Sequence, residues 1–357
     1  MNKLTNIKNK ILLKIILLLS SLSINFFLFN LIFKYSVKLY NSQNIFFINY
    51  LQKNNLIKYQ EKISKKLNLI KYHKINNINL REENLLVKNE IEKLGISDKF
   101  KSFITNDDVQ SFTSHLNNYD FYDSHTPLKD KILSRDLKPT GAYKSYDYNC
   151  QLNSIPLLKV CLNDQILKLA YEYLECVPYI YSINTFITHP NATAFTHDFH
   201  RDLDNLKWLV VFIYWTETSK DDGSFQQIHY THKPSDFLSN LLDKNNNNNV
   251  ENFDKFFNES VPGYGKEEIY KSKFKNEINT YYGKPGKIVI CDTMGLHRGM
   301  PVQKTPRIAT WIRFGVFKSR QEILKHDFNL SNINLSKEAN EYIKGSKNKF
   351  LLSSFIK

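Results

Sequence analysis

Cysteine is scarce in this chain, and its cysteines show no CxxC spacing. There are four of them in 357 residues. Small secreted proteins that rely on disulfides instead carry many closely spaced cysteines. The composition therefore indicates free thiols in a reducing compartment. The four residues are Cys150, Cys161, Cys176 and Cys291.

Acidic residues are almost absent from the first 80 residues. This segment holds thirteen lysines and one acid, Glu61, and carries +12 of the net charge of +14. The remainder of the chain is close to neutral. A protein that binds nucleic acid carries its basic residues on the face that contacts the phosphates. The catalytic part has no such excess, and we expect no nucleic-acid partner.

One long hydrophobic run lies inside the basic segment. Residues 11–33 contain a single lysine, Lys14, and are long enough to span a bilayer. The run is too long for the apolar part of a signal peptide, and no small-x-small cleavage site follows it. We expect it to associate with a membrane as a spanning or inserted helix. An amphipathic or buried helix is the alternative, because Lys14, Asn25 and Asn30 interrupt the run.

Two β-rich stretches flank a His-x-Asp sequence in the middle of the chain. Residues 179–187 read as one strand, and residues 208–215 are so continuously apolar that we expect a strand buried on both faces. Between them lie His200 and Asp202, whose side chains point to the same side if the backbone is extended. A neutral imidazole and a carboxylate that converge on one point suit a divalent transition metal, Fe(II) among them.

A third ligand is expected after a later strand. Residues 287–291 read as a strand, and His297 follows in a turn bounded by glycines. Arg307, ten residues further on, opens another strand over 307–315. This order is typical of iron oxygenases with two histidines and one carboxylate. Three protein ligands leave positions open for a bidentate 2-oxo acid and dioxygen, and the fork of an arginine suits the far carboxylate of that acid.

Each of these residues can also be explained without a metal or co-substrate site. The His-x-Asp pair could belong to a polar loop in which His197 competes as a ligand, although His197 and Asp202 differ in parity along a strand. Arg307 could cap a strand edge, with Arg313 as the alternative anchor. Trp215 alone suits a core position. Two further histidines are expected to be structural or to face substrate, namely His229 and His232.

Residues from about 85 to 315 resemble the phytanoyl-CoA dioxygenase family of Fe(II)/2-oxoglutarate oxygenases. Besides His-x-Asp, the matching pieces are residues 162–174, Trp215-Thr216, Asp221-Asp222-Gly223, Asp292-x-x-Gly-x-His-Arg-Gly and Arg307. The loop after Gly223 departs from the family pattern, because Ser224-Phe225 and Tyr230-Thr231-His232-Lys233 replace the usual residues. This departure concerns the substrate side.

The resemblance implies a fold and a set of site residues. The fold is mainly β with helical additions, built on a double-stranded β-helix core (a jelly-roll or cupin-like arrangement). His200, Asp202 and His297 are implied as iron ligands, and Arg307 and Trp215 as residues that bind 2-oxoglutarate. The implied cofactors are Fe(II), 2-oxoglutarate as co-substrate, and dioxygen. Because Fe(II) and 2-oxoglutarate are available in the cytosol, we expect the catalytic domain to be cytoplasmic.

Four segments are expected along the chain. Residues 1–40 form the membrane-associated segment, 41–80 a basic helical linker, 81–318 the oxygenase domain with an insertion at 235–282, and 319–357 a tail. Helices are expected over 81–94, ended by Gly95, and over 162–174. Residues 98–118 are expected to alternate short helices and turns, and 127–149 to form a loop.

The predicted function is an Fe(II)- and 2-oxoglutarate-dependent dioxygenase that hydroxylates a small-molecule or lipid-linked substrate, releasing succinate and CO2. Asp202 argues against halogenation, since halogenating relatives leave that coordination position to chloride. Two other classes stay open. One is a metal-binding jelly roll that acts as an isomerase or binding module without 2-oxoglutarate turnover. The other is a membrane-anchored interaction protein with a vestigial site.

Overall fold

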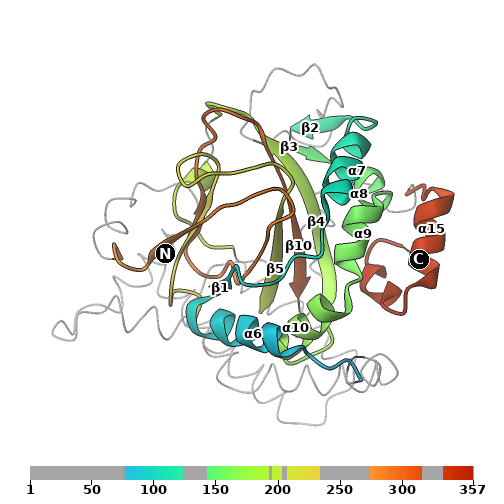
Figure 1. Ribbon diagram of the computed structural model, residues 1–357, viewed down its shortest axis with the longest axis horizontal. Coiled ribbons are helices and arrows are strands. Elements are labelled where there is room, and N and C mark those ends of the chain that lie inside the picture. Colours follow the sequence, from blue (N-terminus) through green and yellow to red (C-terminus); the bar gives the residue numbers. More distant parts are fainter. Residues whose placement is uncertain are drawn as a thin grey trace, which may run out of the picture.

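The computed structural model describes residues 75, 77–123, 143–192, 195–202, 207–233, 274–315 and 333–356. These residues form two antiparallel sheets with helices packed around them (Figure 1). The larger sheet has the strand order β1-β8-β5-β10-β4-β3-β2, and the smaller has the order β7-β6-β9. The strands are β1 (Ile96–Ser97), β2 (Phe121–Asp123), β3 (Tyr143–Tyr146), β4 (Tyr179–Thr188), β5 (Trp208–Tyr214), β6 (Phe225–Ile228), β7 (Ile278–Tyr281), β8 (Ile288–Cys291), β9 (His297–Gly299) and β10 (Arg307–Gly315).

The chain passes repeatedly from one sheet to the other. After β5 in the large sheet it enters β6 and β7 in the small one, returns to β8, crosses to β9 and returns to β10. The inner faces of the two sheets share one buried cluster, in which Phe212 of β5 lies against Phe225 of β6 with ring centroids 5.6 Å apart. Two antiparallel sheets that interleave along the chain and pack face to face form a double-stranded β-helix. The expected fold class, mainly β with helical additions, is confirmed.

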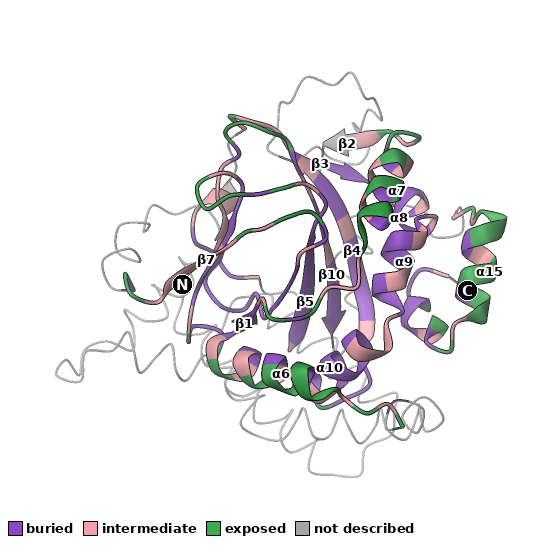
Figure 2. Cartoon of the chain, viewed as in Figure 1, coloured by how far each residue is buried: buried purple, intermediate pink, exposed green. Residues whose placement is uncertain are grey.

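The central strands are buried on both faces because helices cover the outer face of the large sheet. Along β5, Val210 and Phe212 belong to the inner cluster, whereas Leu209 and Val211 belong to a second cluster shared with the helices. Figure 2 shows these strands as mostly buried, with β5 buried along its whole length, while α6 and α15 keep exposed outer faces. The helices are α6 (Glu82–Leu94), α7 (Asn106–Leu116), α8 (Tyr148–Leu152), α9 (Ile155–Cys161), α10 (Asp164–Leu174) and α15 (Lys337–Gly345), with 3₁₀ turns η2 (Phe195–His197) and η4 (Lys349–Leu352).

Helix ends follow local sequence signals. The side chain of Asn163 accepts hydrogen bonds from the backbone N–H groups of Gln165 and Ile166 and thereby begins α10. Gly95 ends α6 in the left-handed conformation, at φ 87°. The predicted helices over 81–94 and 162–174 and the predicted strands over 179–187, 208–215, 287–291 and 307–315 are confirmed.

Two local predictions are wrong. The stretch 98–118 contains one continuous helix, α7, whose start is fixed by a capping box between Thr105 and Asp108. The end of the expected loop 127–149 is instead β3, which pairs with β4, and the beginning of α8, which Asp147 caps. Polar residues suggested a loop there, and pairing with a buried strand overrides that local tendency.

Several predicted segments lie outside the described residues. They are the membrane-associated run 11–33, nearly all of the linker 41–80, most of the insertion 235–282 with its Asn run, and the first part of the tail 319–357. None of the helices in the described residues is long and apolar enough to cross a membrane.

The packing of the helices against the large sheet can be tested by mutation. Phe112 of α7 is fully buried and stacks on Trp215, with ring centroids 3.8 Å apart. We expect Phe112→Ala to lower the free energy of unfolding by about 3–5 kcal/mol, because it removes a buried ring and leaves a cavity. Urea denaturation followed by circular dichroism measures the change. Leu86→Ala on the exposed side of α6 is the matched control and should cost less than about 0.5 kcal/mol; equal effects of the two changes would contradict this packing.

Candidate metal centre

Backbone pairing brings the two halves of the candidate site together. His200 and Asp202 lie between η2 and β5, and His297 is the first residue of β9. The N–H of His200 donates to the carbonyl of His297, and the N–H of His297 donates back to the carbonyl of His200, both at 2.9 Å. Asp202 is held in the same way, since its N–H donates to the carbonyl of Thr293 at 2.9 Å.

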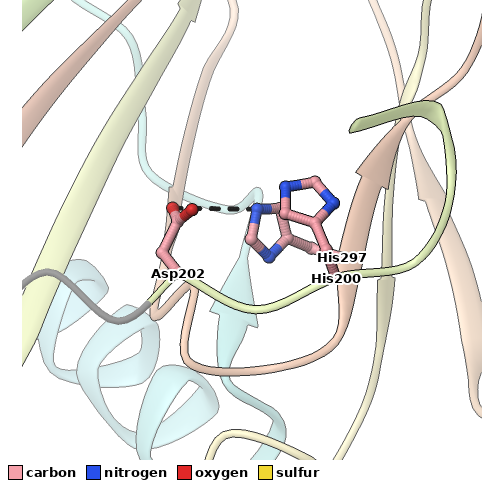
Figure 3. Close-up of side chains that lie close together, drawn as sticks. All are labelled: His200, Asp202 and His297. Carbon is pink, nitrogen blue, oxygen red and sulfur yellow. Dashed lines mark ion pairs between the residues drawn. The ribbon is translucent and has the colours of Figure 1, made fainter. Parts of the chain in front are cut away.

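The three side chains converge as the His-x-Asp spacing suggests (Figure 3). One potential ligand atom from each of His200, Asp202 and His297 lies within 4.8 Å of the other two. His297 Nε2 and an oxygen of Asp202 are 3.8 Å apart, and the two imidazole ring centroids are 4.3 Å apart. Among the His, Cys, Asp and Glu side chains of the described residues, this is the one group so arranged. The spacing leaves room for one ion between them.

Both imidazoles present Nε2 to the same point. His200 Nδ1 donates to the carbonyl of Asp198 at 2.9 Å, and His297 Nδ1 donates to the carbonyl of Gly295 at 3.0 Å. Because a carbonyl only accepts, each Nδ1 carries the proton, and each Nε2 keeps a lone pair. His297 Nε2 is buried and has no hydrogen-bond partner within the described part of the chain. A buried lone pair oriented by such a hydrogen bond is the arrangement of a metal-ligating histidine.

The charges of the three groups also fit a cation. Burial lowers the pKa of His200 and lowers the pKa of His297 to about 3, so both rings are neutral near pH 7. Burial alone would raise the pKa of Asp202, but the Arg313 guanidinium at 3.3 Å holds it below its ordinary value. Two neutral imidazoles and one carboxylate are a ligand set for Fe(II) and similar divalent ions.

The loop before His297 is held by contacts from Arg201, from Tyr173 of α10 and from Gln227 of β6. Arg201 donates from Nη1 to the carbonyls of Thr231 and Met294 at 2.9 and 2.7 Å. The Tyr173 hydroxyl of α10 donates to Asp292 at 2.6 Å. A Cβ on Gly295 would lie 2.6 Å from the Gln227 amide nitrogen, so only glycine fits there without displacing that side chain. These contacts hold the third ligand in place without coordinating it.

Arg307 lies close to β9, the strand that begins with His297. The guanidinium is buried, with 3% of the residue exposed, and it donates to the carbonyl of Gly223 at 2.7 Å and to the Thr188 hydroxyl at 3.1 Å. A Cβ on Gly299, two residues after His297, would lie 3.3 Å from Arg307 Nη2. Two residues of a strand span about 7 Å. The guanidinium therefore lies beside β9, about two residues along the strand from His297.

The remaining candidates have other surroundings. His197 lies near Arg307 and Arg298; burial, followed by these two charges, lowers its pKa to about 4. His229 contacts the Tyr281 hydroxyl at 2.6 Å, and His232 contacts the carbonyl of Glu92 at 3.2 Å. None of the three histidines joins the ligand group.

Trp215 does not suit its predicted role as a residue that lines the co-substrate site. Its side chain belongs to the outer cluster, stacks on Phe112 and donates from Nε1 to the Thr310 hydroxyl at 2.8 Å. Tyr214, the neighbouring residue, faces the interior instead. Successive side chains of a strand point to opposite faces, so the strand places Trp215 away from the metal centre.

Two residues near the ligands received little or no weight from sequence reasoning. Arg313 pairs with Asp202, although it was considered only as an alternative to Arg307. Trp311 lies between the two arginines on β10 and is not among the site residues that the sequence predicts. The signal was present, because alternation along β10 gives 307, 309, 311 and 313 the same face.

Removing a ligand gives a direct test of the metal centre. We expect His297→Ala to weaken Fe(II) or Co(II) binding by more than about a hundredfold, since even supporting residues cost ten- to a hundredfold. Calorimetric titration of the full-length protein measures the affinity. His197→Ala is the matched control and should leave affinity unchanged; loss of binding in this control with retention in His297→Ala would favour the competing ligand set.

Comparisons with known proteins give a consistent but weak likeness. No family model matches the chain, and no curated protein matches it. HygX from Streptomyces hygroscopicus, solved with nickel and 2-oxoglutarate bound, is 16% identical with a TM-score of 0.43, covering 66% of this chain and 87% of its own. The 2-oxoglutarate-dependent carbocyclase SnoK is 13% identical with a TM-score of 0.41, at 66% and 84% coverage. EctD from S. alaskensis is 13% identical with a TM-score of 0.40, at 64% and 75% coverage. This likeness is too weak to assign a function to the chain.

Proposed function

We propose that this protein is an Fe(II)- and 2-oxoglutarate-dependent dioxygenase that hydroxylates a small molecule. The convergence of His200, Asp202 and His297 around one point, with the buried Nε2 of His297 lacking a partner in the described residues, is the observation that carries the proposal. A balanced reaction consumes substrate, 2-oxoglutarate and dioxygen, and yields hydroxylated substrate, succinate and CO2.

The ligand set supports an open iron site. His200, Asp202 and His297 would hold the ion, and three protein ligands leave further coordination positions for small molecules. Bound iron would supply the redox chemistry that couples decarboxylation of the co-substrate to oxidation of a C–H bond. Because Asp202 is a carboxylate, no position is left to a halide in its place, and hydroxylation is the favoured outcome.

Arg307 is the proposed anchor for the distal carboxylate of 2-oxoglutarate. Both hydrogen bonds of its guanidinium go to neutral oxygens, and no ion pair with a carboxylate is present among the described residues. A buried cation without an opposite charge is costly, and a bound carboxylate would relieve that cost. An arginine fork binds a carboxylate through two parallel hydrogen bonds, which also fixes the orientation of the co-substrate.

Within this class of enzyme, we propose that the chain belongs to the phytanoyl-CoA dioxygenase family. The support is the order of sequence motifs, from His-x-Asp through Asp292-x-x-Gly-x-His-Arg-Gly to Arg307. A cytoplasmic catalytic domain with a membrane-associated segment at 11–33 stays a prediction, as does a lipid-linked substrate.

Turnover of the co-substrate tests the proposal. The full-length protein, prepared without oxygen and reconstituted with Fe(II), should convert 2-oxoglutarate to succinate slowly even without substrate, and His200→Ala should abolish this. Absence of succinate together with absence of the absorption band that 2-oxoglutarate gives when it chelates Fe(II) would contradict the proposal. A metal-binding jelly roll without 2-oxoglutarate turnover would then be the better interpretation.

The role of Arg307 is testable separately. Arg307→Gln should weaken 2-oxoglutarate binding to the metal-loaded protein by about 10- to 100-fold, the value of a charge-assisted hydrogen bond, while metal affinity stays unchanged. Arg307→Lys keeps the charge but loses the fork, so an intermediate affinity is expected. Arg298→Gln is the matched control, because that side chain bonds to Gln226 instead. Similar losses in Arg298→Gln and Arg307→Gln would contradict the assignment.

A further inference from the structure

The three tryptophans of the chain differ in how their indole N–H groups are bonded. Trp208 donates to the Thr293 hydroxyl at 2.8 Å, and Trp215 donates to the Thr310 hydroxyl at 2.8 Å. The N–H of Trp311 is buried and has no acceptor among the described residues. An unsatisfied buried donor is unfavourable, and most buried donors in native proteins have an acceptor. The N–H of Trp311 therefore suits an acceptor that a bound molecule supplies.

Trp311 faces the interior between the two sheets, and Asn184 faces the same way. Trp311 of β10 is directly paired with Asn184 of β4, and directly paired residues share a face of a sheet. The Trp311 ring lies near the rings of Phe186 and Phe212, at centroid distances of 5.1 and 6.1 Å. Because Phe186 and Phe212 belong to the inner cluster, the shared face is the interior one.

The pair of Asn184 and Trp311 remains accessible although its neighbours are closed off. Both residues are partly exposed, whereas Phe186 and Phe212 are 2% and 3% exposed and Ala309 is fully buried. A side chain on an inner face keeps exposed surface where the two sheets do not close over it. The pair therefore marks a part of the interior that a molecule from solvent can reach.

A second unsatisfied polar atom lies on the same inner face. Ser145 of β3 is directly opposite Phe186 of β4, so the two side chains share that face. Ser145 is 1% exposed, and its hydroxyl has no hydrogen-bond partner in the described part of the chain. Apolar rings with a few polar groups between them are typical of small-molecule sites.

The hydrogen-bonding groups on this face are uncharged, which indicates the chemistry of a ligand. The Trp311 indole only donates, whereas the amide of Asn184 and the hydroxyl of Ser145 can both donate and accept. The guanidinium over the Trp311 ring, that of Arg313, already has a carboxylate partner in Asp202 at 3.3 Å. A further charge would be buried without a partner, which is costly, so an uncharged oxygen is the better acceptor. Arg313 also places this region one side chain away from the candidate metal ligands.

We propose that Trp311 and Asn184 form a subsite for an uncharged polar group of the primary substrate. The indole N–H donates to a carbonyl or hydroxyl oxygen, the Asn184 amide bonds to the same group, and Phe186 and Phe212 contact the adjoining apolar part. This inference rests on the proposed function. It makes the substrate an amide, ketone or alcohol that is neutral at the end bound beside β10.

The indole N–H groups themselves report on the subsite. The full-length protein would be labelled with ¹⁵N at the tryptophan indole nitrogens, and Trp→Phe changes at 208, 215 and 311 would assign the three signals. Zn(II) replaces iron as a diamagnetic ion, and 2-oxoglutarate is added first, with its binding checked by calorimetry. Acetamide and benzamide are then titrated in, each paired with the carboxylate of the same shape, acetate or benzoate.

Both amides should move the Trp311 indole proton downfield in a saturable way, because their carbonyl oxygen accepts its hydrogen bond. Neither carboxylate should move it, and the signals of Trp208 and Trp215 should stay in place as internal controls.

Variants test the two polar groups separately, with benzamide binding followed on the signals of benzamide itself. Trp311→Phe keeps an aromatic ring and removes the donor, and Asn184→Leu keeps the shape and removes the amide. Each should weaken benzamide binding by about tenfold while 2-oxoglutarate affinity is unchanged. Trp215→Phe is the matched control and should leave benzamide affinity unchanged, because that indole lies on the opposite face of the sheet.

Three results would overturn the inference. A shift of the Trp311 signal by 2-oxoglutarate alone would make the indole part of the co-substrate site. Equal or larger shifts from the carboxylates would exclude a subsite selective for uncharged groups. Binding of 2-oxoglutarate without a saturable shift from either amide would exclude the subsite and leave the proposed function intact. If 2-oxoglutarate does not bind to the metal-loaded protein, the proposed function fails, and the assignment of a substrate fails with it.

Discussion

The reciprocal backbone hydrogen bonds between His200 and His297 are the contact on which the candidate site depends. One residue belongs to the segment that leads into β5 of the large sheet, and the other opens β9 of the small sheet. Side chains of directly paired residues lie on the same face of a ladder, within about 5 Å of each other. The pairing therefore places two imidazoles side by side although 97 positions separate them in the sequence. It also links the segment before β5 to the small sheet at the candidate metal centre.

Because the central strands are buried on both faces, their two sets of alternating side chains have different neighbours. On β5 and β10, one set of alternating side chains packs against the helices, and the other set lines the interior with the charged groups. This alternation determines which face of the sheet Trp215 and Trp311 each occupy. Trp215 faces the helices, whereas Trp311 faces the interior. The two tryptophans therefore lie on opposite faces of the large sheet.

Sequence patterns predicted the parts of this site that depend on short-range geometry. The strands, the i, i+2 relation of His200 and Asp202, and the position of Arg307 at a strand start all follow from periodicity and spacing. The contacts that orient the ligands could not be predicted in this way. Asp202 meets Arg313 across 111 positions of sequence, and the loop before His297 is held by Tyr173 from a helix. Such contacts depend on how the sheets close, which no local pattern contains.

The ion pair between Asp202 and Arg313 connects the metal centre to the rest of the interior. Metal binding requires an ionised carboxylate and neutral imidazoles, and burial by itself favours only the second of these conditions. Arg313 opposes the effect of burial on Asp202, so the carboxylate is ionised before any metal arrives. The same guanidinium also lies over the Trp311 ring, 4.8 Å from its centroid. The pair therefore links a candidate metal ligand to the strand that also carries Arg307.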